Sequence, residues 1–283
     1  MTRILLDVDT GTDDAVAIMA AALHPELEIV GITCVNGNVS LDHVVDNTLR
    51  VIDHIGAAVP VYRGASRPLI RPDFPIPRRI LNPEGSEFQV DELPLPAAVS
   101  TTADASAVDA IVSTFLAPGA EDVVLVATGP LTNVAAALAA EPRLAEAVFS
   151  AGLRDVLVVP LDATHDAPLS LEDCQRFTEL GTPAGIAAAE LIRHRIIHYP
   201  DDPAAERLTA PVHDALCIAA LVHPDVLQEV VSGTVHVETA GTHTLGELVL
   251  DTRPWRTERS NAHVALRADE HVFADFLADA LRG

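Results

Sequence analysis

The 283-residue sequence contains no lysine, so all 18 of its basic residues are arginine, against 41 aspartate and glutamate residues. The formal net charge of −23 predicts that most of the surface repels nucleic acid and anionic membranes. We therefore expect neither nucleic acid nor a membrane as a partner. An acidic balance favours divalent cations, although most of these carboxylates are expected to be solvated surface groups.

The sequence also has little cysteine and no long apolar run. Its three cysteines, Cys34, Cys174 and Cys217, lie far apart and form no Cys-x-x-Cys pair, which argues against a disulfide framework and a zinc cluster. No apolar run reaches the roughly 18 residues of a membrane span, and no signal-peptide pattern opens the chain. We expect a soluble, cytoplasmic protein with a substantial core, because 49% of the residues are apolar.

Short β-branched runs alternate with alanine-rich amphipathic stretches along most of the chain. We expect strands at 3–7, 28–35, 59–62, 122–127 and 155–160, and helices at 13–23, 40–56, 104–117, 131–140, 183–195, 214–222 and 270–281. This alternation predicts an α/β fold: an open, mainly parallel sheet with helices on both faces and a Rossmann-like core. Further strands near 233–238, 246–250 and 263–267 predict a small β-rich C-terminal patch.

We expect residues 1–283 to form a single domain, since no internal repeat and no linker divides them. The segment 64–97 differs from the rest, because it holds seven prolines and has little periodicity. It predicts a long surface loop, and loops of this length often carry function.

Four aspartates lie within eight residues of the stretch LLDVDTGTDDA, where the first strand ends and the first helix begins: Asp7, Asp9, Asp13 and Asp14. Helix capping and the helix dipole account for one or two of them, at about 1 kcal/mol. Carboxylates packed this closely raise one another's pKa unless a cation neutralises them. The stretch therefore predicts a metal site, and oxygen ligands favour calcium or magnesium over zinc.

Polar residues also follow the other expected strands or open later helices. The carboxyl ends of parallel strands share one edge of a sheet, where ligands bind in open α/β folds. The residues expected to meet the aspartates at this edge are Asn36, Asn38, Thr128, Asp162, His165, His213 and Asp214.

Two enzyme families place Asp-x-Asp directly after a strand. In the haloacid-dehalogenase-like phosphatases the motif resembles DxDGTxxD, and its first aspartate is a nucleophile. Here Gly11 comes one residue late, and the lysine that usually holds the phosphoryl group is absent from the chain. An Asp-dependent phosphatase is therefore kept as an alternative.

The chain more closely resembles the inosine–uridine-type nucleoside hydrolases, or nucleoside N-ribohydrolases. DVDTGTDDAVAI has that family's DxDxGxDD spacing, with Thr10 in place of the usual proline. Four further stretches resemble family segments: GITCVNGNVSLDHVVDNTLRV, VATGPLTNVAAAL, LVVPLDATH and APVHDALCIAALVHPDV. The matches extend from residue 4 to about residue 225 and are more specific together than any one alone.

The resemblance implies calcium-dependent hydrolysis of the N-glycosidic bond of ribonucleosides, releasing ribose and a free base in purine or pyrimidine salvage. It implies that Asp9, Asp14, the carbonyl of Thr128 and Asp214 hold the Ca²⁺ ion. Asp9 is also implied as the general base that takes a proton from the attacking water.

The remaining roles are implied in the same way. Asp13 and Asn38 are expected to contact ribose hydroxyls, and His213 is expected on the side of the leaving base. Asp7 is expected to support the metal ligands, and His165 to be structural. A homodimer or homotetramer is usual in the family.

One family segment has no counterpart in this sequence. In the family a strand ends in Met-Gly-Gly, and the loop after it carries a Glu-Phe-Asn segment that grips the ribose. Neither sequence occurs in this chain. The layout indicates that this internal segment is missing near residue 147. A weakly active or inactive metal- or ribose-binding relative is therefore a second alternative.

Overall fold

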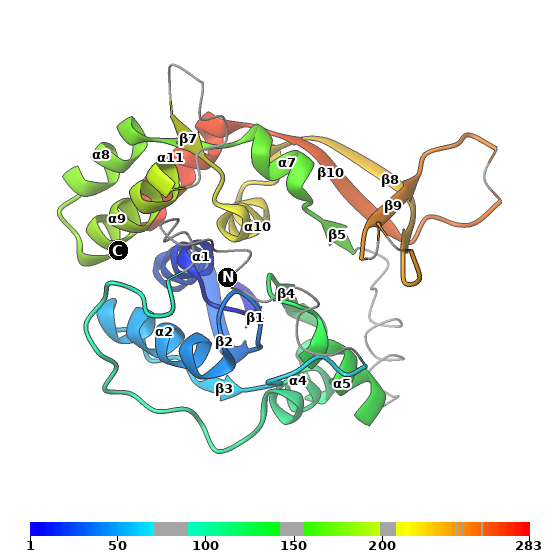
Figure 1. Ribbon diagram of the computed structural model, residues 1–283, viewed down its shortest axis with the longest axis horizontal. Helices are drawn as coiled ribbons and strands as arrows, with labels where there is room; N and C mark the ends of the chain where they lie inside the picture. Colours follow the sequence, from blue (N-terminus) through cyan, green and yellow to red (C-terminus); the bar gives the residue numbers. More distant parts are fainter. Residues whose placement is uncertain (71–89, 142–155, 199–207, 242, 245, 256) are drawn as a thin grey trace.

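A four-stranded parallel sheet carries the candidate site (Figure 1). Its order is β3-β2-β1-β4. The strands are β1 (Thr2–Val8), β2 (Leu27–Cys34), β3 (Val61–Arg63) and β4 (Val123–Ala127). The computed structural model describes residues 1–70, 90–141, 156–198, 208–241, 243–244, 246–255 and 257–283. Most of the proline-rich loop expected at 64–97 therefore lies outside the described residues.

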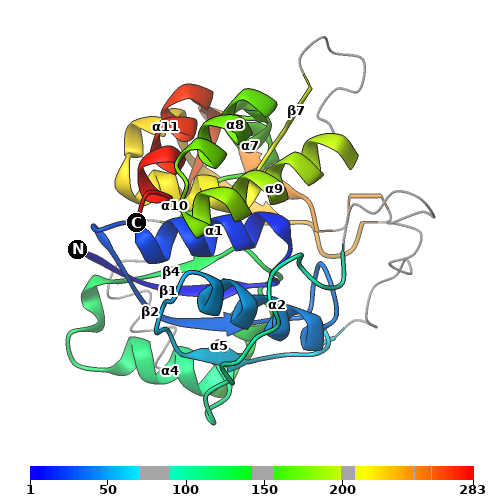
Figure 2. The same cartoon turned by 90° about the vertical axis from the view of Figure 1, so that its left-hand side faces the viewer.

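Helices cover both faces of this sheet, as the sequence predicted. On one face lie α1 (Thr12–Leu23) and α2 (Leu41–His54), and on the other α4 (Ala107–Leu116) and α5 (Thr132–Ala140) (Figure 2). Side chains alternate along β1, so Ile4 and Leu6 pack in the core with α1 and α2, whereas Leu5 packs with Ile111 and Ala137. The same alternation directs Asp7 towards α5.

Helix α1 is covered on its other side by a second helical layer, which includes α9 (Pro183–His198), α10 (His213–Val222) and α11 (Glu270–Ala280) (Figure 2). Every residue from Thr12 to Ala21 is buried as a result. This burial explains why the helix is apolar nearly all round rather than along one stripe. Its polar N-terminal turn is therefore enclosed between the sheet and the second layer.

A second, mixed sheet has the order β5-β10-β8-β9 and confirms the expected β-rich patch. Its strands are β5 (Leu157–Val158), β8 (Leu227–Val237), β9 (Leu248–Asp251) and β10 (Ala262–Ala268). The expected strand at 155–160 is shorter than predicted, and among the described residues it pairs with β10, not with the first sheet. The 3₁₀ turns η1 (Ala120–Asp122) and η2 (Pro224–Val226) precede β4 and β8.

Two helices were not predicted. The LDATH sequence forms α7 (Leu161–Asp166), not a strand end followed by a loop, and α8 (Leu171–Glu179) follows β6 (Leu169–Ser170). Ser170 and Asp173 form a capping box at the start of α8, a pattern that the sequence does contain. Strand β6 pairs with β7 (Thr209–Ala210).

Two exclusions drawn from composition agree with the structure. All three cysteines are free thiols, as expected. Within the described part of the chain, no helix is long and apolar enough to cross a membrane.

Candidate functional site

Asp14 lies at the centre of the aspartate cluster, in the first turn of α1. Its side chain is fully buried. Its Oδ2 accepts a hydrogen bond from the backbone N–H of Gly11 at 3.0 Å, which caps the helix. Its Oδ1 accepts one from the hydroxyl of Thr128 at 2.8 Å. Asp14 therefore joins the start of α1 to the turn that follows β4.

Asp14 is one of three carboxylates that come together from the N-termini of two helices. Asp13 and Asp14 belong to the first turn of α1, and Asp214 belongs to the first turn of α10. Each of the three places one carboxylate oxygen within 4.8 Å of the other two. The two helix dipoles favour negative charge here, but each contributes only about half an elementary charge. The helices alone therefore do not balance three carboxylates.

Burial and the charges of neighbouring carboxylates disfavour the ionised forms of Asp9, Asp14 and Asp214. Burial, with the charge of Asp13 added, raises the pKa of Asp14 to about 6. Burial and the charge of Asp14 raise the pKa of Asp9 well above its ordinary value, and burial and the charge of Asp13 do the same to Asp214. Oδ1 of Asp13 is buried and accepts no hydrogen bond, but it is paired with the guanidinium of Arg195, 3.2 Å away. The other carboxylates of the cluster have no such cation beside them among the described residues. Such an all-oxygen donor set fits a hard cation such as Ca²⁺ or Mg²⁺.

Asp9 is held beside this cluster by the loop that follows β2. Its Oδ2 accepts a hydrogen bond from the backbone N–H of Asn38 at 2.7 Å. A Cβ atom at Gly37 would lie 1.9 Å from the same oxygen, so the close approach requires glycine. The amide of Asn38 is 3.5 Å from Oδ2 of Asp14. Asn36, at the end of β2, is also buried.

Asp7 lies beneath the site, on the α5 face of the sheet. Its Oδ1 accepts hydrogen bonds from the hydroxyl of Thr33 at 2.6 Å and from the amide of Asn133 at 2.8 Å. Its backbone carbonyl accepts from the N–H groups of Thr128 and Gly129. Burial, opposed in part by these two side-chain hydrogen bonds, raises the pKa of Asp7 to about 6. Asp7 thus fastens the Thr128 turn to β1.

His213, at the start of α10, is in contact with α7. Its Nδ1 lies 2.7 Å from the hydroxyl of Thr164, and its ring centroid lies 5.4 Å from that of His165. Two residues of the LDATH sequence, Thr164 and His165, therefore contact His213 from helix α7. Asp162, on the same helix, is exposed.

Two further residues belong to the site and were not singled out from the sequence. Asn133 donates from Nδ2 to Asp7 and to the carbonyl of Cys34. It is the asparagine of the stretch VATGPLTNVAAAL, so the family resemblance could have indicated it. Arg195, on α9, is only 2% exposed, and its Nη1 lies 3.2 Å from Oδ1 of Asp13. No pattern in the sequence indicated its burial, because arginine on a helix is ordinarily solvated.

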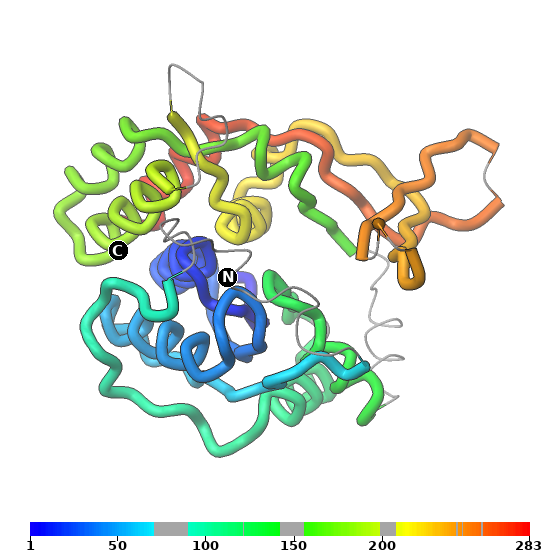
Figure 3. The backbone as a smooth tube through the Cα atoms, in the orientation of Figure 1, coloured from blue at the N-terminus to red at the C-terminus, as the bar shows by residue number. Residues whose placement is uncertain are grey.

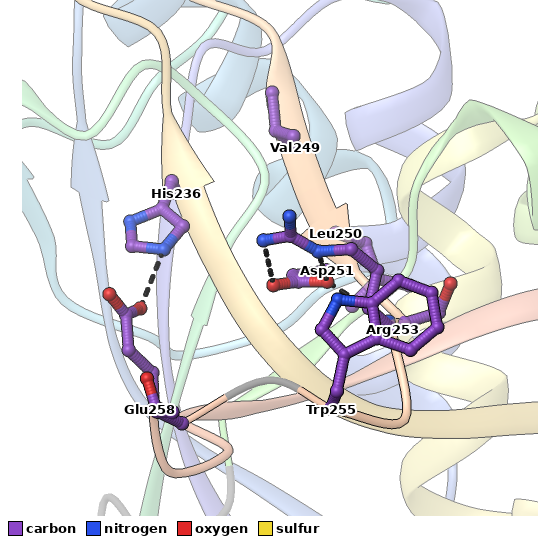
Figure 4. A pocket seen from close by; sticks show the side chains of 9 residues that line it. His236, Val249, Leu250, Asp251, Arg253, Trp255 and Glu258 are labelled. Atoms are coloured by element: carbon purple, nitrogen blue, oxygen red, sulfur yellow. Dashed lines mark hydrogen bonds and ion pairs between the residues drawn. The ribbon is translucent and has the colours of Figure 1, made fainter.

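A cavity of about 540 Å³ lies next to β9 (Figure 4). None of its lining residues belongs to the carboxylate cluster. Among its lining residues, Arg253 forms an ion pair with Asp251, and Nε2 of His236 lies within hydrogen-bond distance of Glu258, at 2.9 Å. We therefore place the candidate site at the carboxylates and not at this cavity.

Comparison with known proteins identifies the family. The model of the inosine-uridine preferring nucleoside hydrolases matches residues 4–149 and 145–275. The pyrimidine-specific ribonucleoside hydrolases RihA of Shigella boydii serotype 4 and of Escherichia coli K12 are each 33% identical to this chain, over 99% of it and 98% of theirs.

Two solved structures share the fold. The purine-preferring ribonucleoside hydrolase from Gardnerella vaginalis superposes with a TM-score of 0.82 at 26% identity, over 99% of this chain and 98% of that one. The plant nucleoside hydrolase PpNRh1 gives 0.83 at 20% identity, over 100% and 99%. The matched motifs, the fold and the family model agree: this chain belongs to the inosine-uridine preferring nucleoside hydrolase family.

Proposed function

We propose that this enzyme hydrolyses the N-glycosidic bond of ribonucleosides in a calcium-dependent reaction that releases ribose and a free base. Activity on ribonucleosides follows from the family, whereas the cation and the residue roles are our proposal. The observation that carries it is the meeting of Asp14 and Asp214 at two helix N-termini, with carboxylate oxygens within 4.8 Å of each other. The family assignment gives no support to the phosphatase alternative.

Asp9, Asp14, the carbonyl of Thr128 and Asp214 are the proposed ligands of the cation. Thr128 is fixed against the cluster, because its hydroxyl donates to Asp14 and its backbone N–H donates to the carbonyl of Asp7. When bound, Ca²⁺ supplies the positive charge that orients a water molecule and the vicinal hydroxyls of a ribose.

Asp9 is the proposed general base. Its carboxylate is oriented by the N–H of Asn38 at 2.7 Å, which holds it beside the carboxylates of the proposed cation site, where it can accept a proton from the attacking water. In the reaction the water oxygen bonds to C1′, and the water's proton passes to Asp9. The C1′–N bond breaks, and its electron pair stays on the nitrogen of the leaving base.

Asp13 and Asn38 are proposed to bind ribose hydroxyls, and His213 to face the leaving base. The hydroxyl of Thr164 donates to the carbonyl of Leu161 at 3.3 Å, so its oxygen is available to accept from Nδ1–H of His213. With its ring oriented by Thr164, a protonated His213 is proposed to donate to the leaving base.

The proposal includes a shortened chain near residue 147. The family model matches in two pieces that meet at residues 145–149, which is consistent with the absence of an internal segment there. The alignment with RihA spans 313 positions, 30 more than this chain has residues. The proposal names ribonucleosides without a preference for purine or pyrimidine bases, since the relatives include both specificities.

Ribose release from inosine, uridine and related nucleosides tests these roles, with Asp9→Asn compared against Asp162→Asn on the exposed face of α7. We expect Asp9→Asn to lower kcat by at least about 100-fold and Asp162→Asn to leave it near that of the wild type. Equal activity in both variants would contradict the role of Asp9. Phosphate release from phosphomonoesters that is lost in Asp7→Asn would support the phosphatase instead.

We also propose a cytoplasmic homo-oligomer. A dimer or tetramer of the 29.9 kDa chain would be detected by mass measurement in solution, and a mass equal to one chain would contradict this part of the proposal.

A further inference from the structure

Arg195 is a buried cation that links the two halves of the candidate site. Its Nε donates to the carbonyl of Pro211 at 2.9 Å, just before His213 and Asp214. Its Nη1 donates to the hydroxyl of Thr12 at 3.0 Å, at the start of α1. The same Nη1 lies 3.2 Å from Oδ1 of Asp13. A guanidinium with almost no solvent exposure requires such partners, because an unpaired buried charge is strongly destabilising.

The contact with Arg195 bears on whether Asp13 binds the cation or the ribose. Asp13 has a carboxylate oxygen as close to Asp14 and Asp214 as these two have to each other, so its distance alone would let it bind the cation. The proposed function instead assigns Asp13 to a ribose hydroxyl. A carboxylate that is already paired with a guanidinium is a weaker ligand for a cation, because part of its charge is neutralised.

We propose that Arg195 is a positioning residue that neutralises Asp13 and thereby keeps it out of the cation's ligand set and available to the sugar. The proposal rests on the proposed function, since it assumes a cation at Asp14 and Asp214. Arg195 acts through Asp13 and through the two backbone segments that it joins, not by touching the reacting atoms.

The proposal predicts opposite effects on cation binding and on catalysis. In Arg195→Met the unpaired Asp13 is free to turn towards Asp14 and Asp214 and become an additional ligand. Ca²⁺ should therefore bind more tightly, by about 10-fold, because one more carboxylate charge faces the ion. The value of kcat/KM should fall by about 10-fold or more, because Asp13 no longer holds the ribose in its reactive position.

A merely structural role predicts a different pattern, in which loss of the arginine weakens Ca²⁺ binding and activity together. Arg195→Lys separates charge from geometry. It keeps a positive charge beside Asp13 but lacks the planar group that joins Thr12 to Pro211. We expect its Kd for Ca²⁺ within about 2-fold of the wild type, with part of the activity lost.

The experiment is calorimetric titration of chelator-treated full-length protein with CaCl₂, and it does not depend on turnover. The variants are Arg195→Met, Arg195→Lys and the double variant Asp13→Asn/Arg195→Met, with Arg195→Gln in place of the methionine if that protein does not fold. Arg176→Met is the matched control, because Arg176 forms an exposed ion pair with Asp275 on the neighbouring helix.

The tighter binding of Arg195→Met should disappear in the double variant, because Asp13 is then no longer a carboxylate. Unchanged or weaker Ca²⁺ binding in Arg195→Met would overturn the proposal, and so would tighter binding that persists in the double variant. Failure of the wild type to release ribose would contradict the proposed function, whereas the calcium titration would still decide the role of Arg195.

Discussion

The buried carboxyl of Asp7 makes the stability of the metal-free protein depend on pH. Burial raises its pKa from an ordinary 3.8 to about 6. A difference of about 2 in pKa corresponds to about 3 kcal/mol. Between these two values the folded protein binds more protons than the unfolded chain, so the free energy of unfolding falls as the pH rises. The stabilising effect of the protonated form is thus present at low pH and lost as the pH passes through about 6.

Asp7→Asn removes this one titration, because an amide does not ionise in this range. About half of the 3 kcal/mol, or about 1.5 kcal/mol, falls between about pH 5 and about pH 7.5. On this pH change the wild type should therefore lose about 1.5 kcal/mol more stability than Asp7→Asn does. The difference corresponds to about 0.5 M in the urea midpoint.

The assay is urea unfolding of both proteins in the presence of a chelator at the two pH values. The large net negative charge also disfavours folding at higher pH, but it acts on both proteins and cancels in their difference. Asp104→Asn, on an exposed loop residue, controls for the removal of one charge. If Asp7→Asn and the wild type lose the same stability between the two pH values, the reasoning about burial of Asp7 is wrong.

Three further predictions concern side-chain placement. His213→Ala should lower kcat on nucleosides by about 100-fold but leave kcat on p-nitrophenyl riboside nearly unchanged, because that leaving group needs no proton. Equal losses of kcat on both substrates would exclude a contact between His213 and the leaving base. Gly37→Ala should displace Asp9, whose Oδ2 would be 1.9 Å from the new Cβ, and lower kcat/KM by about 100-fold; activity near that of the wild type would contradict the inferred close contact. Gly64→Ala would place its Cβ 2.2 Å from the carbonyl oxygen of Cys34, so calorimetry should show a loss of about 1–3 kcal/mol in stability; an unchanged melting temperature would count against it.

The sequence allowed the first half of the fold to be predicted well, because its local patterns are strong there. The apolar run at 3–7 and the alternation of strands and helices up to residue 140 correspond to β1 through α5. The second half was less predictable. A two-residue strand such as β5 has no periodicity of its own, and its pairing with β10 depends on contacts across more than a hundred residues of sequence.

The candidate site also has one part that the local sequence indicates and another that depends on how distant helices pack. The clustering of aspartates in one short stretch could be read directly, since like charges at a strand end need an explanation. The approach of Asp214 to Asp13 and Asp14 depends on the packing of α10 against α1. The sequence placed Asp214 at the same edge of the sheet, but no local pattern showed which carboxylates would come within ligand distance of one another. Arg195 could not be predicted, because its burial results from the second helical layer and not from its neighbours in sequence.

We propose that the carboxylates at the start of α1 and α10 form a calcium-dependent nucleoside hydrolase site. The most direct measurement is ribose release from inosine and uridine by the full-length protein, first as purified, then with excess chelator, then with CaCl₂ restored. We expect ribose release to be lost with the chelator and recovered with Ca²⁺, but not recovered when Ca²⁺ is added to Asp14→Asn. Ribose release that continues unchanged in the chelator would contradict this proposal.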